Sequence, residues 1–205
     1  TRKVSLDTMI EHSISVKKGI NKSLMVVDMP YNTYRNNQEA LKNAKKILFK
    51  TKCDAVKLEG GKKIINIIKN LVKNKIPVMG HLGLLPQYET GKFRFKGRKE
   101  LERTRILNDA KLLENAGVFS IVLECVESSL AKQITSSIEI PTIGIGASSF
   151  CDGQVLVTDD LLGLNPINFR FVKKYTNLST NIDQAVKKFS YDVRKKKFPK
   201  KKHSY

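Results

Sequence analysis

Tryptophan is absent from the 205 residues, cysteine occurs only three times, and no apolar run is long enough to cross a bilayer. A transmembrane helix needs about 20 predominantly apolar residues and a secretory signal needs an apolar stretch near its start, so neither membrane insertion nor export is indicated. Three cysteines without a CxxC pair disfavour both a disulfide framework and a zinc knuckle. A reducing cytoplasm is therefore the expected location.

Acidic residues are scarce beside basic ones: 19 Asp and Glu stand against 38 Lys and Arg, and the formal net charge is +19. Residues 187–205 hold nine of the basic residues and one acid, so a basic tail carries much of the excess. Elsewhere lysines alternate with isoleucines at helical spacing, as in residues 62–75, which is typical of a solvated helix face. Because neither interleaved aromatics nor a binding motif accompanies the charge, we interpret it as a basic surface, with nucleic-acid binding as the alternative.

Short apolar segments alternate with helical patterns along the chain, which is typical of parallel βα units. The expected strands are short and largely β-branched, as strands buried on both faces are: residues 24–27, 55–58, 77–79, 119–123, 142–145 and 154–157. The expected helices cover residues 7–20, 38–49, 62–72 and 100–115. We therefore expect a barrel domain in residues 1–186, with about six units of an eight-stranded barrel and two strands absent from this chain, followed by the tail 187–205. An open, doubly wound six-stranded sheet is the alternative.

Charged and polar side chains stand where the expected strands end: Asp28, Lys57, Glu59, His81 and Glu124. Each has an ordinary structural explanation when taken alone, such as a turn, a helix start, a buried histidine or an ion pair. However, the carboxyl ends of parallel strands form one rim, so side chains at these positions converge on one pocket. Their repetition indicates a functional site.

The residue types at this rim suit metal-assisted enolisation of a 2-oxo acid. Asp28 and Glu59 supply two hard oxygen ligands, which suit Mg²⁺, an ion that keeps waters and takes further oxygens from a substrate. Lys57 would place a cation beside the same substrate, and a carboxylate such as Glu124 in a partly dry pocket could act as a general base. Glycosidases also use paired carboxylates, but the lysine between them and the lack of tryptophan make that chemistry less attractive.

Several blocks of sequence resemble the ketopantoate hydroxymethyltransferase family, and together they cover essentially the whole chain. The most specific block is VMGHLGLLPQ at residues 78–87, joined by GQVLV at residues 153–157. Further matches are SLDTMIEH at 5–12, VKLEGG at 56–61, VLECV at 122–126, IGIGA at 143–147, and the closing residues around 198–199 and 203–205.

This resemblance implies a (β/α)8 TIM barrel of the phosphoenolpyruvate/pyruvate superfamily type. It also implies transfer of a hydroxymethyl group from 5,10-methylenetetrahydrofolate to 3-methyl-2-oxobutanoate, which forms 2-dehydropantoate (ketopantoate) for pantothenate and coenzyme A synthesis. Members of the family are Mg²⁺-dependent cytoplasmic homodecamers, so a homodecamer that binds this substrate and the folate co-substrate is the expected assembly.

Carried over position by position, the resemblance gives each rim residue a role. Asp28 would bind both metal and substrate, Glu59 would bind the metal, and Lys57 would contact the substrate. Glu124 would accept the C3 proton, and His81 would line the pocket.

The chain departs from the family pattern in two places. No segment here matches the family's Gly-Asp-Ser segment, whose aspartate joins the metal site and whose serine contacts the substrate. The basic loop at residues 92–98 matches only in part. Three alternatives therefore accompany the enzyme reading: a truncated non-catalytic homologue, a basic nucleic-acid-binding protein, and a carbon–carbon lyase of the same superfamily.

Overall fold

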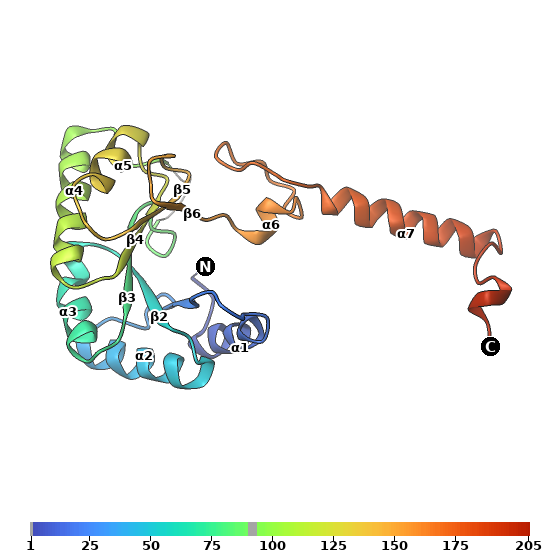
Figure 1. The fold of residues 1–205 in the computed structure, drawn as a ribbon, viewed down its shortest axis with the longest axis horizontal. Helices are drawn as coiled ribbons and strands as arrows, with labels where there is room; N and C mark the ends of the chain where they lie inside the picture. The colour runs from blue at the N-terminus through green and yellow to red at the C-terminus, as the bar shows by residue number, and fades with distance from the viewer. Residues whose placement is uncertain (1, 90–93) are drawn as a thin grey trace. The chain divides into compact units, whose positions relative to one another are not determined.

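The computed structural model describes residues 2–89 and 94–205, and within them six parallel strands form one sheet (Figure 1). Each strand pairs with the next one in the sequence: β1 (Val26–Asp28), β2 (Ala55–Glu59), β3 (Val78–Gly83), β4 (Ser120–Glu124), β5 (Thr142–Ile145) and β6 (Gly153–Gln154). A doubly wound sheet reverses its strand order at a switch point, whereas this order runs straight through. The doubly wound alternative is therefore wrong, and the sheet is a curled half-barrel.

Helices cover one side of this sheet: α2 (Asn37–Thr51), α3 (Ile65–Lys73), α4 (Glu100–Asn115) and α5 (Ser128–Thr135) (Figure 1). The first helix, α1 (Leu6–Lys17), contacts α2 and β1. Among the described residues, no helix is both long and apolar enough to span a membrane.

The hydrophobic core lies between the sheet and these helices. Leu58, Ile121 and Leu123 are fully buried there, because every second residue of a strand points to the same face. Gly80 lies on this side of β3, where a Cβ atom would come within 2.9 Å of the Leu113 side chain of α4. Glycine therefore lets α4 pack closely on the sheet.

The chain contacts divide the protein into two units, Thr1–Val155 and Leu156–Tyr205. The second unit contains α6 (Thr158–Leu161), α7 (Leu178–Arg194) and the 3₁₀ turn η2 (Lys201–His203). The expected boundary at residue 186 falls inside α7, so the basic tail begins within a helix. No residue of α7 is buried.

Each expected strand and helix overlaps an observed one, but of the expected strand at 154–157 only Gln154 lies in a strand, because β6 ends there. The second large difference is β3, which continues through His81 to Gly83, although the sequence predicted that it would end at residue 79. The predicted helix at 62–72 begins as a 3₁₀ turn, η1 (Lys62–Ile64), before α3. Helices α5, α6 and α7 were not predicted. Within the described residues the sheet starts at β1 and stops at β6 without closing.

Candidate functional site

The five predicted rim residues project from one face of the sheet, opposite the helix-covered core. Asp28 pairs with Lys57, Glu59 pairs with His81, and Glu124 pairs with Gly83, two residues beyond His81. Paired residues and residues two apart share a face of a sheet. The strand register therefore brings all five side chains together, as the sequence predicted.

Lys57 connects two of these side chains. Its Nζ lies 3.1 Å from Oδ2 of Asp28 and 3.4 Å from Nδ1 of His81. The Lys57 side chain is 16% exposed and that of Asp28 is 46% exposed, so the pair opens to solvent on the Asp28 side. A cation held in this way can also attract a substrate carboxylate.

Glu59 is the most buried carboxylate of the group, with 5% of its side chain exposed. Burial raises its pKa to about 7, and the charges of Asp28 and Glu124 act in the same direction, whereas a hydrogen bond from the backbone amide of Gln87 and the charge of Lys57 oppose the rise. The amide of Gln87 donates to Oε2 of Glu59 over 3.0 Å. Three carboxylates thus converge where a bound cation would relieve their repulsion.

His81 lies at the centre of the group, with 2% of its side chain exposed. Burial lowers its pKa, so the ring is neutral at physiological pH. Because Lys57 can only donate, we assign Nδ1 of His81 as an acceptor and the proton to Nε2. Nε2 lies 3.2 Å from Oε2 of Glu124 but makes no hydrogen bond among the described residues. A ligand oxygen would satisfy this buried N–H group.

The donor set fits Mg²⁺ better than a metal that needs a closed cage. The part of the chain that the structure describes contains no group of three or more His, Cys, Asp or Glu side chains able to hold a metal. Magnesium is commonly held by one or two carboxylates, with waters and substrate oxygens completing its shell. Asp28 and Glu59 can supply those two carboxylates.

Gln87 and Tyr34 belong to the same buried group, although the sequence patterns predicted a role for neither residue. Oε1 of Gln87 accepts a hydrogen bond from the Tyr34 hydroxyl over 2.7 Å, and both side chains are buried. Gln87 is the last residue of the motif at residues 78–87, and this position was the one sequence feature that could have indicated its role. Its contacts with distant loops are formed only in the folded chain.

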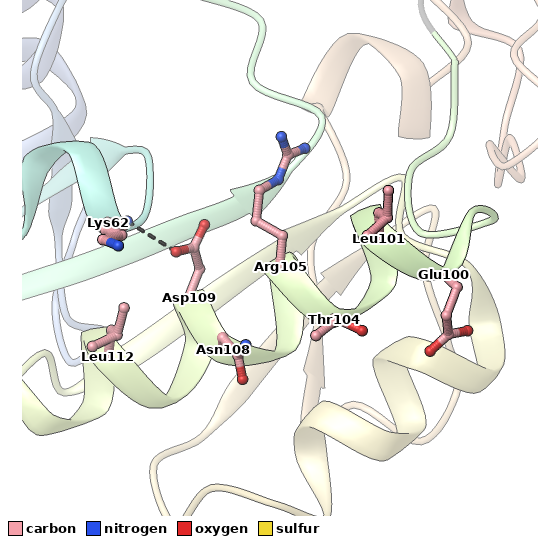
Figure 2. Close-up of a pocket in the computed structure, with 8 residues that line it drawn as sticks. All are labelled: Lys62, Glu100, Leu101, Thr104, Arg105, Asn108, Asp109 and Leu112. Carbon is pink, nitrogen blue, oxygen red and sulfur yellow. Dashed lines mark hydrogen bonds between the residues drawn. The ribbon is translucent and has the colours of Figure 1, made fainter.

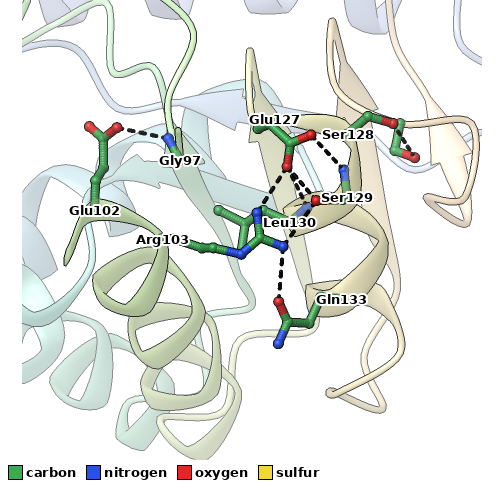
Figure 3. Close-up of polar contacts among 9 residues, drawn as sticks. Gly97, Glu102, Arg103, Glu127, Ser128, Ser129, Leu130 and Gln133 are labelled. Atoms are coloured by element: carbon green, nitrogen blue, oxygen red, sulfur yellow. Dashed lines mark hydrogen bonds and ion pairs between the residues drawn. The ribbon is translucent and has the colours of Figure 1, made fainter. Parts of the chain in front are cut away.

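A polar network supports the loop that follows Glu124 (Figure 3). Glu127 caps the start of α5 by accepting from the amides of Ser129 and Leu130, and it pairs with Arg103 of α4 over 3.0 Å. The backbone of Lys96 bonds to Cys125 and Glu127. Residues 94–98 of the predicted basic loop therefore run along the Glu124 loop, whereas residues 92 and 93 lie outside the described residues.

A separate groove lies along α4 (Figure 2). Its lining consists of residues of α4 and of Lys62 in η1, and Oδ1 of Asp109 accepts from the Lys62 amide over 3.0 Å. None of the predicted site residues lines this groove. We therefore assign no functional role to this groove between α4 and η1.

The whole chain is similar to known proteins. A family model described as ketopantoate hydroxymethyltransferase matches residues 1–201. The chain is 70% identical over 205 residues to a 3-methyl-2-oxobutanoate hydroxymethyltransferase of Pelagibacter ubique, covering 100% of this chain and 79% of that protein. It is 47% identical over 206 residues to a protein of the same name from Rhizobium etli, covering 98% of this chain and 76% of that protein.

Solved structures resemble the fold at low sequence identity. Phosphonopyruvate hydrolase matches with a TM-score of 0.56 and 11% identity, over 95% of this chain and 68% of that chain. Phosphoenolpyruvate phosphomutase from Streptomyces platensis subsp. rosaceus matches with a TM-score of 0.54 and 10% identity, over 94% and 69% respectively. These likenesses concern the fold alone.

Proposed function

Because this chain belongs to the ketopantoate hydroxymethyltransferase family, we propose that its rim residues form ketopantoate from 3-methyl-2-oxobutanoate and 5,10-methylenetetrahydrofolate. The family is the one that the sequence motifs indicate, and it identifies the protein as a transferase. The observation that carries the site assignment is the convergence of three carboxylates, a lysine and a neutral histidine on one face of the sheet. The family membership favours this enzyme over the nucleic-acid-binding alternative.

Asp28 and Glu59 are the residues we propose as Mg²⁺ ligands. Bound there, the ion would withdraw electron density from the keto oxygen of the substrate and so acidify its C3 proton. The raised pKa of Glu59 supports this assignment, because a buried carboxylate among like charges is stabilised by a cation.

Lys57, His81 and Glu124 act on the substrate itself in this proposal. Lys57 holds the substrate carboxylate, and Nε2 of His81 donates to a substrate oxygen. Glu124 takes the proton from C3, and the C–H electrons move into the enolate. The nucleophilic C3 then forms a bond to the one-carbon unit of the folate co-substrate. Both carbon–nitrogen bonds of the methylene bridge break, water supplies the hydroxyl oxygen of the product, and tetrahydrofolate leaves with a proton on each freed nitrogen. Folate carries the one-carbon unit, and the protein orients the reactants.

The assembly is a further part of the proposal. We propose that the six strands belong to an eight-stranded barrel of the phosphoenolpyruvate/pyruvate superfamily type, and that the protein is a cytoplasmic homodecamer. Straight sequential order of parallel strands supports the barrel. Family resemblance supports the decamer, and light scattering of the native protein measures it directly.

Product analysis by mass spectrometry tests the proposed reaction. Ketopantoate should form when both substrates and Mg²⁺ are present, and chelation with EDTA should abolish its formation until Mg²⁺ is restored. Undiminished product after chelation would contradict the metal assignment. Failure to form product under every condition would contradict the activity of this chain.

A further inference from the structure

Gln87 is a buried residue that makes four hydrogen bonds around the rim. Its backbone amide donates to Oε2 of Glu59 over 3.0 Å, and its side-chain Nε2 donates to the carbonyl of Met29 over 2.9 Å. Its Oε1 accepts from the hydroxyl of Tyr34 over 2.7 Å, and its carbonyl accepts from Nε of Arg2 over 2.9 Å. Only 4% of Gln87 is exposed.

These bonds join segments that are far apart in the sequence. Met29 directly follows Asp28, Glu59 ends β2, and Gln87 lies in the loop after β3. The amide of Met29 also donates to the carbonyl of Lys57 over 2.9 Å. The backbone next to Asp28 is therefore held on one side by β2 and on the other by the Gln87 side chain.

The orientation of the Gln87 amide group follows from its partners. The Met29 carbonyl can only accept, so it must face the Nε2 amino group. Oε1 then faces the Tyr34 hydroxyl, which remains a donor because burial raises the pKa of Tyr34 above its ordinary value. A neutral amide makes both bonds without adding charge beside the three carboxylates.

We infer that Gln87, oriented by Tyr34, is a positioning residue that holds Glu59 and Asp28 in one arrangement for binding the metal. With Oε2 of Glu59 occupied by the Gln87 amide, Oε1 is left on the side of His81, 3.8 Å from Nδ1. Oε2 of Glu59 is thus held by the backbone of the loop after β3, and Oε1 faces the other rim residues. The inference rests on the proposed function, since it concerns the proposed Mg²⁺ ligands.

Two substitutions test this role. Tyr34→Phe removes the hydroxyl that orients Gln87 with little change in volume. Gln87→Glu is isosteric, but it loses the donor to Met29 and adds a negative charge. The matched control is Thr51→Val, because Thr51 is also buried and its hydroxyl bonds to the carbonyl of Ile47 over 2.9 Å at the end of α2, outside the site.

Three measurements read out the positioning. Hydrogen exchange at the Gln87 amide should quicken by at least about tenfold in the metal-free Tyr34→Phe protein, and not in the control. Calorimetric titration with Mg²⁺ alone should show affinity reduced by about 10- to 100-fold in both variants. Their kcat should fall, the KM for the folate co-substrate should stay unchanged, and excess Mg²⁺ should restore turnover.

The outcomes separate the inference from the proposed function. Variants that bind Mg²⁺ as tightly as the parent protein, or that keep slow exchange at Gln87, would overturn the positioning role alone. A parent protein that binds no Mg²⁺ would overturn the proposed metal site, and the positioning role with it. A loss of turnover that excess Mg²⁺ does not restore would contradict a role of Gln87 and Tyr34 through the metal ligands.

Discussion

At the scale of single residues, the chemistry of the site depends on how burial changes the pKa values of an acidic group, Glu59, and a basic group, His81. Burial favours the neutral form of both carboxyl and imidazole groups, so it raises the pKa of Glu59 and lowers that of His81. Glu59 is therefore poised between its two protonation states near neutral pH, and His81 is a neutral donor.

Glu59 gives the first prediction. Its carboxyl group must lose a proton to bind Mg²⁺, and its pKa in the metal-free protein is raised to about 7. The affinity for Mg²⁺ should therefore increase from about pH 6 to about pH 8, with release of a proton. Calorimetry in two buffers with different ionisation enthalpies measures both quantities. An affinity that is independent of pH, with no proton release, would contradict the assignment of Glu59.

Gly83 gives the second prediction. Its φ is +95°, and a Cβ atom there would overlap the carbonyl oxygen of Glu124. Gly83→Ala should therefore lower the free energy of unfolding by about 1–3 kcal/mol, measured by urea denaturation. The matched control is Gly19→Ala, where the added methyl group meets only the Val16 carbonyl at 3.6 Å. Equal stability of the two variants would show that the end of β3 tolerates a side chain at this position.

At the scale of elements, the stability of α5 depends on the cap at its N-terminus, because the helix itself is short. The helix has eight residues, and Glu127 caps it while bridging to Arg103 of α4 (Figure 3). These contacts stabilise the ionised carboxylate, and the bonds to Ser129 contribute most to a pKa lowered to about 2. The cap also fixes the loop between Glu124 and the helix.

The third prediction concerns this cap. Because the pKa of Glu127 is lower in the folded chain, its contribution to stability is present above about pH 4.3 and is lost as the pH falls toward about 2. Glu127→Gln should lower the free energy of unfolding by about 1 kcal/mol near neutral pH and have little effect near pH 2. Urea titrations across this range measure the difference. The exposed Glu139→Gln serves as the control, and a pH-independent effect at position 127 would refute the electrostatic explanation.

At the scale of the whole molecule, the sequence predicts the βα order well, because strands buried on both faces are continuous apolar runs. It places the end of β3 too early, since His81 is a polar residue inside the strand, on the same face as Glu59 and Glu124. It misses α5, which is short, and α7, whose apolar residues stand exposed among lysines.

The predicted site residues converge because the alternation of a strand is a local property that the sequence already contains. The role of Gln87, in contrast, depends on contacts with residues that are distant in the sequence. Its bond to Glu59 comes from the backbone, and its side chain contacts Met29 and Tyr34, which are 58 and 53 residues away along the chain. Such contacts depend on the tertiary fold, so no pattern of residue types predicts them.

In the proposed mechanism, Glu124 removes the C3 proton of a 2-oxo acid held at this rim. The most direct measurement is proton NMR of 3-methyl-2-oxobutanoate in deuterium oxide with Mg²⁺ and no folate, which follows deuterium exchange at C3. The protein should catalyse this exchange, Glu124→Gln should slow it by at least about 100-fold, and the Glu139→Gln control should leave it unchanged. Exchange at the parent rate in Glu124→Gln would contradict this role of Glu124.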